Sequence, residues 1–146
     1  MKKMAPIKKT PLTLVLFSGL MLLVIVSKSQ IPNDISDIND IIVGFETGNV
    51  KILSGYFNQN VNLGVLGNNN MYSKAQTQQI LSEFFNTYVP DPEKKFTIIH
   101  YSEREGTKWV IGTIETKKGE VIRVYFMLKQ NDDKEYIHQL SFDKQE

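Results

Sequence analysis

The sequence predicts an α+β domain in which helices come first and an antiparallel meander of strands comes last. Between residues 34 and 88, two stretches carry apolar side chains at helical spacing. After residue 95, four stretches are rich in β-branched and aromatic residues, and short polar segments separate them. Helices followed by consecutive strands are typical of α+β folds with helices on one face of a sheet.

The first predicted helix covers residues 34–47. Gly48 suits the position that ends a helix in a left-handed conformation, and Asn49 is a typical N-cap for a short second helix. Acidic residues in the opening turns favour the positive end of the helix dipole, and the spacing of a calcium-binding loop is absent. The apolar stripe consists of Ile35, Ile38, Ile41, Ile42 and Phe45, and the acidic residues are Asp34, Asp37 and Asp40.

The stretch "GNNNMYSKAQTQQILSEFF", residues 67–85, predicts a turn followed by a helix. Alternation over residues 61–65 predicts a short strand before it, and residues 67–70 are typical turn residues. Ser73 and Gln76 have the spacing of a capping box, so we expect a helix from Lys74 to about Tyr88. Two prolines, at 90 and 92, then prevent its continuation.

The second half of the chain predicts four antiparallel strands, at 96–103, 108–116, 120–129 and 134–142. The third strand has large apolar side chains on both of its faces. We therefore expect the second face to be covered, either by a second subunit in a homodimer or by curvature of the sheet. One face carries Ile122, Val124, Phe126 and Leu128, and the other carries Val121, Arg123, Tyr125 and Met127.

The first 29 residues have the order of a secretory signal peptide. A lysine-rich start precedes an apolar run over 12–26, and Ser27-Lys28-Ser29 supplies small residues before a cleavage site. The alternative is a membrane anchor, although the apolar run is shorter than the roughly 20 residues that span a bilayer. We expect export to the periplasm or the extracellular space without membrane attachment after cleavage, a short tether at 30–33 and a single domain over 34–146.

Composition excludes several classes of function. The chain has no cysteine, which excludes disulfides, thiolate chemistry and lipid attachment at a cysteine. Residues 1–29 hold five of the 17 basic residues and none of the 16 acidic ones, so the remaining chain has 12 basic residues and a net charge of −4. An acidic domain without a basic patch does not favour binding of nucleic acid.

The order and spacing of several short motifs resemble a family of small exported bacterial proteins. The motifs are Gly48-Asn49, Tyr56-Phe57 with Val61, "YSKAQ" at 72–76, Gly112-Thr113, "RVYF" at 123–126 and "IHQL" at 137–140. That family is the domain of unknown function DUF4783, within the nuclear-transport-factor-two-like (NTF2-like), cystatin-like superfamily. The resemblance implies a cone in which a strongly curved antiparallel sheet wraps two to three helices, often dimeric through its outer face. It implies no activity.

Enzymes of this superfamily place an acid or a histidine inside the cone, and the two histidines of this chain are candidates for such a base. Their alternation with apolar neighbours is equally consistent with structural roles. No cofactor motif occurs, and two histidines are too few for a usual zinc site. With a four-residue turn at 130–133, Tyr125 would lie opposite His138. The candidate ligand-binding residues are Tyr72, His100, Arg123, Tyr125 and His138.

Three functions stay open from the sequence. The first is an exported, non-catalytic module that binds an envelope protein or a small ligand, apolar or carboxylate-bearing, in a cone-shaped pocket. The second is a small isomerase-like or cyclase-like enzyme that uses His100 or His138. The third is a structural assembly protein that dimerises through its sheet.

Overall fold

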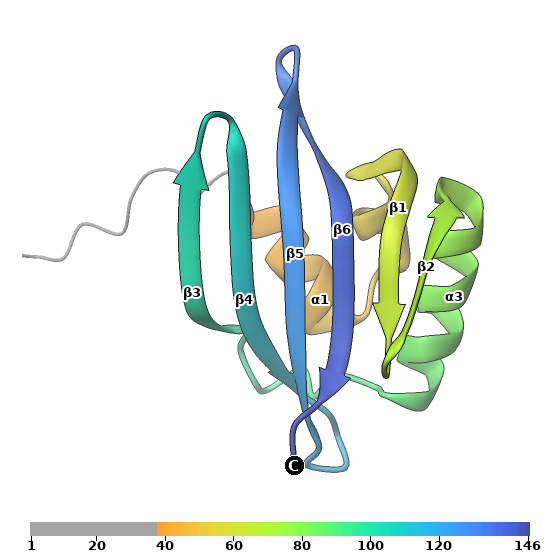
Figure 1. Ribbon diagram of the computed structural model, residues 1–146. Coiled ribbons are helices and arrows are strands. Elements are labelled where there is room, and N and C mark those ends of the chain that lie inside the picture. The colour runs from red at the N-terminus through yellow and green to blue at the C-terminus, as the bar shows by residue number, and fades with distance from the viewer. Residues whose placement is uncertain (1–37) are drawn as a thin grey trace, which may run out of the picture. The chain divides into compact units, whose positions relative to one another are not determined.

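The computed structural model describes residues 38–146, and the expected signal peptide, its cleavage site and the tether lie outside this part of the chain. Six strands form one sheet in the order β2-β1-β6-β5-β4-β3, with helices on one of its faces (Figure 1). The α+β class, with helices first and one mainly antiparallel sheet, is confirmed. The elements are α1 Asn39–Thr47, α2 Val50–Ser54, β1 Phe57–Val65, β2 Asn68–Ser73, α3 Lys74–Thr87, β3 Thr97–Arg104, β4 Thr107–Glu115, β5 Val121–Asn131 and β6 Lys134–Lys144.

The helix ends follow the predicted capping residues. Gly48 ends α1 with a φ of 60°, and the Asn49 side chain accepts a hydrogen bond from the Ile52 N–H at the start of α2. The capping box of α3 is complete, since Ser73 Oγ accepts from the Gln76 N–H and Gln76 Oε1 accepts from the Ser73 N–H. These side chains satisfy backbone groups that a helix end otherwise leaves without partners.

The four strands of the predicted meander are confirmed, and each pairs with its neighbour in antiparallel orientation. The pairing of β1 with β6 is parallel. The last strand of the chain therefore lies between β1 and β5. This parallel pair joins the N-terminal half of the domain to the meander.

The assignment of Asn68–Asn70 to a turn is wrong. These residues form the first half of β2, and the turn between β1 and β2 consists only of Leu66 and Gly67. Both turn residues have positive φ, 50° and 87°, which is the backbone that two-residue hairpins require. The sheet therefore has two N-terminal strands where the sequence predicted one.

Aromatic rings fill the space between the sheet and the helices. The Phe45 ring of α1 lies 5.3 Å from that of Phe126 and 5.9 Å from that of Phe142, measured between centroids. Phe84 of α3 lies 4.7 Å from Phe142. Rings from two helices thus pack against the central Phe142, and this part of the interior is filled.

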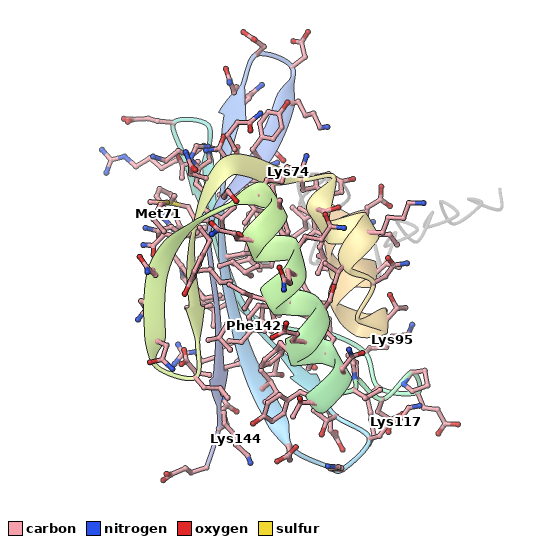
Figure 2. All side chains as sticks on the ribbon, turned by 90° about the vertical axis from the view of Figure 1, so that its right-hand side faces the viewer. Met71, Lys74, Lys95, Lys117, Phe142 and Lys144 are labelled. Atoms are coloured by element: carbon pink, nitrogen blue, oxygen red, sulfur yellow. The ribbon has the colours of Figure 1, made fainter. Side chains whose placement is uncertain are left out.

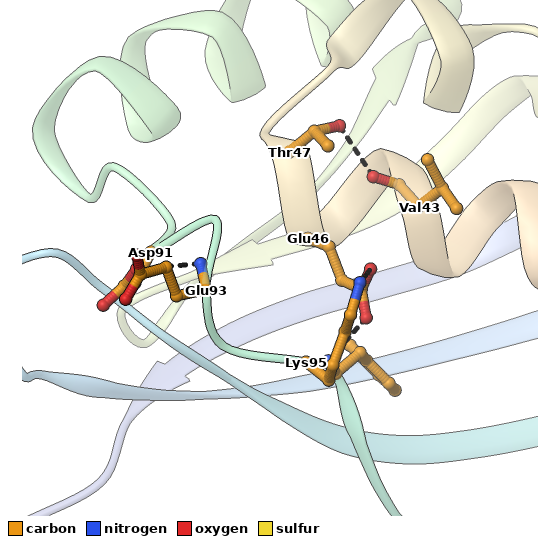
Figure 3. A network of polar contacts seen from close by, with 7 residues as sticks. Val43, Glu46, Thr47, Asp91, Glu93 and Lys95 are labelled. Atoms are coloured by element: carbon orange, nitrogen blue, oxygen red, sulfur yellow. Dashed lines mark hydrogen bonds and ion pairs between the residues drawn. The ribbon is translucent and has the colours of Figure 1, made fainter.

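A polar clamp fixes the start of β3 to α1. Glu46 Oε1 accepts a hydrogen bond of 2.8 Å from the Phe96 N–H, and its Oε2 forms an ion pair of 3.4 Å with Lys95 (Figure 3). The clamp places the Phe96 ring on the buried side of the sheet, 5.9 Å from Phe45. Nearby, Asp91 accepts a hydrogen bond from the Glu93 N–H and shapes the loop before β3.

Candidate functional site

The face of the sheet opposite the helices, which we call the open face, carries most of the predicted site residues. Cross-strand pairing arranges its side chains in rows that run across all six strands. One row contains His100, Ile111, Tyr125, Ser141, Gly64 and Asn69. The next contains Ser102, Trp109, Met127, Gln139, Asn62 and Met71.

The middle of this face is apolar and partly shielded by its own side chains. Trp109, Ile111 and Tyr125 are half-buried, and Met127 is only 8% exposed although no described helix lies over it. Large side chains on adjacent strands cover one another in this way. The result is a continuous apolar area with polar groups around it.

Arg123 and Tyr125 lie together in a hollow of the open face. Its volume is about 420 Å³, and Ile111, Ser141, Asp143 and Lys144 also line it. Arg123 is opposite Asp143, not Leu140 as the assumed turn length implied. Burial raises the pKa of Tyr125, whose hydroxyl donates a 3.0 Å hydrogen bond to Gln139 Oε1.

His138 is not the partner of Tyr125, which lies opposite Ser141. The β5–β6 turn has two residues, and a β-bulge at His138 then shifts the register by one more position. His138 is half-buried, and its pKa is lowered by burial and by the positive charge of Lys129. A bulge leaves almost no trace in a sequence, so strand alternation alone could not predict this displacement.

The other two predicted residues lie apart from the hollow. His100 is exposed on the open face of β3, beside Ile111. Tyr72 is half-buried on the helix side of β2, where it packs against the core. Neither histidine is among the core residues, so the packed interior has no histidine base.

Sequence reasoning missed a polar cluster at the end of the sheet where the β3–β4 and β5–β6 turns lie. Lys108 is 4% exposed, and its ammonium group is 2.8 Å from a carboxylate oxygen of Glu135. Glu103 lies opposite Lys108 and accepts a hydrogen bond from the Tyr101 hydroxyl. The signal in the sequence is a cation in phase with the buried positions 110, 112 and 114 of its strand.

A second hydrogen bond belongs to this cluster. The Tyr56 hydroxyl donates to Asp40 Oδ2 over 3.0 Å, and burial, followed by this bond to a carboxylate, raises the pKa of Tyr56. Tyr56, Glu103, Lys108 and Glu135 line a surface hollow of about 490 Å³. Among the described residues, no group of three or more histidine and acidic side chains has the arrangement of a metal site.

The six-stranded sheet with helices on one face has the fold of NTF2-like domains. A solved NTF2-like protein of unknown function from Shewanella baltica has 11% identity and a TM-score of 0.60, over 77% of this chain and 90% of its own. The chain belongs to the DUF4783 family, a domain of unknown function whose model matches residues 38–143.

Solved members of this family have the same fold. The protein from Bacteroides ovatus is 30% identical, with a TM-score of 0.67 over 73% of this chain and 94% of its own. The one from Bacteroides uniformis is 24% identical, with a TM-score of 0.67 over 74% and 96%. A search of curated proteins found no match. None of the helices within residues 38–146 is long and apolar enough to span a membrane.

Proposed function

We propose that this protein is an exported, non-catalytic module that works by pairing with a second copy of itself through the open face of its sheet. The observation that carries the proposal is the pair of rows centred on Trp109, Ile111 and Tyr125. Apolar side chains gather there on a face that no described helix covers. Contiguous exposed apolar patches usually mark interaction surfaces.

The charges beside these rows favour a second copy over an unrelated partner. Arg123 and Asp143 lie opposite each other at one end of the patch, and both side chains are exposed. In a twofold interface each charge meets a symmetry mate, and two opposite charges side by side are self-complementary. An apolar centre that is flanked by one positive and one negative charge is therefore complementary to the same surface of a second copy.

The packed interior supports the non-catalytic part of the proposal. The space where related enzymes hold a substrate is occupied here by Phe45, Phe84, Phe126 and Phe142. His100 and His138, the candidate bases, lie outside the core. An isomerase or cyclase reaction would therefore require a site other than the interior.

The experiment compares oligomeric state in the chain that begins at residue 30. Multi-angle light scattering should give a dimer for the wild type at high micromolar concentration. Ile111→Arg places a charge in the centre of the patch and should give a monomer of unchanged circular dichroism. Val43→Arg, at an exposed apolar position of α1, is the matched control and should stay dimeric. A monomeric wild type, or equal effects of the two substitutions, would contradict the proposal.

A second candidate function rests on the 420 Å³ hollow beside Arg123. An exposed guanidinium and the Tyr125 ring form a wall suited to a small carboxylate-bearing ligand. Native mass spectrometry of the protein purified from its own source tests this candidate. Arg123→Met should remove any bound carboxylate, and a wild-type protein that carries no small molecule would contradict this candidate.

A further inference from the structure

The two edge strands of the sheet differ in their protection against strand addition. β3 carries three features that discourage pairing with another chain, namely Glu103, Arg104 and a β-bulge between Ile98 and His100. β2 has neither charge nor bulge, and residues 52–73 contain no charged side chain at all. Met71, in the middle of β2, is 59% exposed.

Two backbone N–H groups of β2 point away from β1. The Met71 N–H donates a 2.8 Å hydrogen bond to Asn70 Oδ1, and the Ser73 N–H donates a 3.0 Å bond to Gln76 Oε1. The backbone N–H and C=O groups of an antiparallel strand point to alternate sides with a period of two residues. Those of residues 69, 71 and 73 therefore all point away from β1. An added strand would therefore have to replace the side-chain carbonyls of Asn70 and Gln76 with its own backbone carbonyls, and the second exchange opens the capping box of α3. In Figure 2, which looks onto this edge, α3 lies beside β2 and does not cover it.

We propose that β2 pairs in antiparallel orientation with β2 of a second copy of this chain, Met71 lying opposite its own copy and Asn69 opposite Ser73. Self-pairing of a strand sets identical or near-identical residues against one another, and like charges there are destabilising. β2 avoids this because it is uncharged. In this register Asn69 faces Ser73 and Asn70 faces Tyr72, so every directly opposed pair over residues 69–73 is uncharged.

This interface is separate from the open face. β2 has only six residues, so the contact is small and its association weak and dependent on concentration. Two isologous interfaces with different axes build a closed tetramer or a growing chain, whereas the open face alone builds a dimer.

The test uses the Ile111→Arg variant, in which open-face pairing is removed and only the edge is left. Sedimentation velocity between 10 µM and about 1 mM should show a reversible monomer–dimer equilibrium. Met71→Lys in this background puts two lysines opposite each other and should weaken the association constant at least tenfold. Ile99→Lys, at a 56% exposed position on the opposite edge strand, is the matched control and should change it less than twofold.

A cross-linking experiment checks the register. The chain has no cysteine, so a single Met71→Cys substitution gives an unambiguous product. Directly opposed residues of a hydrogen-bonded pair lie about 5.5 Å apart between Cα atoms, which a disulfide spans. Air oxidation should give a covalent dimer much faster for Met71→Cys than for Ile99→Cys. Equal rates, a loss of association by Ile99→Lys, or an Ile111→Arg variant that is monomeric at every concentration would overturn the proposal.

Discussion

The Phe96 ring lies directly over Gly112 on the neighbouring strand. A Cβ atom at Gly112 would be 2.2 Å from Phe96 Cε1 and 2.7 Å from the Thr97 carbonyl oxygen, closer than atoms can approach. Gly112 therefore provides the space in which this ring packs, and the Glu46 clamp holds the ring there. The packing of β3 on β4 depends on the absence of a side chain at this position.

Gly112→Ala should lower the free energy of unfolding by about 2–4 kcal/mol, because a ring and a backbone carbonyl must both move. Gly64→Ala is the control. Its Cβ would meet the end of the flexible Asn69 side chain, at 2.1 Å, and the Ser141 Cβ at 3.1 Å. We expect a cost below about 1 kcal/mol there. Urea denaturation measures both, and equal costs would contradict this account of the Phe96–Gly112 contact.

Two substitutions of Glu46 distinguish the contribution of its hydrogen bond to the Phe96 N–H from that of its ion pair with Lys95. Glu46→Gln keeps an acceptor for the Phe96 N–H and loses only the pair with Lys95, which is exposed, so the expected cost is below about 0.5 kcal/mol. Glu46→Ala also loses the acceptor and should cost about 1 kcal/mol more. Equal losses for Gln and Ala, by thermal or urea denaturation, would show that the charge and not the hydrogen bond is the main contribution.

Removing the charge of Glu135 should destabilise the domain through Lys108. Glu135→Gln weakens the main counter-charge of a buried ammonium group, with an expected cost of roughly 1–3 kcal/mol. Replacing both residues, Lys108→Met with Glu135→Leu, removes the buried charge itself and should cost less than the single change. A double variant that is less stable than Glu135→Gln would indicate that the ion pair contributes net stability.

His138 should make the domain less stable as the solution becomes acidic. Its pKa is lower in the folded protein than in the unfolded chain, so the unfolded state binds the proton first. The contribution of His138 is fully present above its unfolded pKa, near neutral pH. It is lost as pH falls from there through the folded pKa. NMR titration should give a pKa below 6.5, and His138→Gln should flatten the dependence of stability on pH between 7 and 5. A folded-state pKa above 6.5 would contradict this.

We predict that the chain is exported and that its mature form begins at or near Gln30. Signal peptidase cleaves after small residues, and Ser27 and Ser29 stand at the required positions. Intact-mass measurement of the protein from its native envelope checks this. A mass that includes residues 12–26 would indicate a membrane anchor instead.

Local signals in the sequence were sufficient for the helices and the meander. Asn49, Ser73 with Gln76, and Gly48 act on backbone groups within a few residues, so their roles can be predicted without the fold. Strand alternation likewise identified the faces of β5. These features depend on neighbours along the chain.

The features that sequence reasoning missed depend on distant neighbours. β2 reads as a turn because asparagine is common in turns, and only pairing with β1 shows that Asn68–Asn70 are extended. The bulge that moves His138 is a property of the β5–β6 ladder. The burial of Lys108 follows from the approach of Glu135 across two strands. Whether the cone is open or packed could not be predicted from the sequence, because it depends on how the rings of Phe45, Phe84, Phe126 and Phe142 meet between the helices and the sheet.

The position of β6 between β1 and β5 has a consequence for the order of folding. Phe57 pairs with Ile137 and Val65 with Phe142, contacts that join residues far apart in the chain. During synthesis the β1–β2 hairpin cannot acquire its sheet neighbour until the last strand has emerged. Closure of such long loops slows folding. A ribosome-bound chain that ends before residue 134 should therefore leave the hairpin protease-sensitive, and protection should appear in a single step when β6 becomes available.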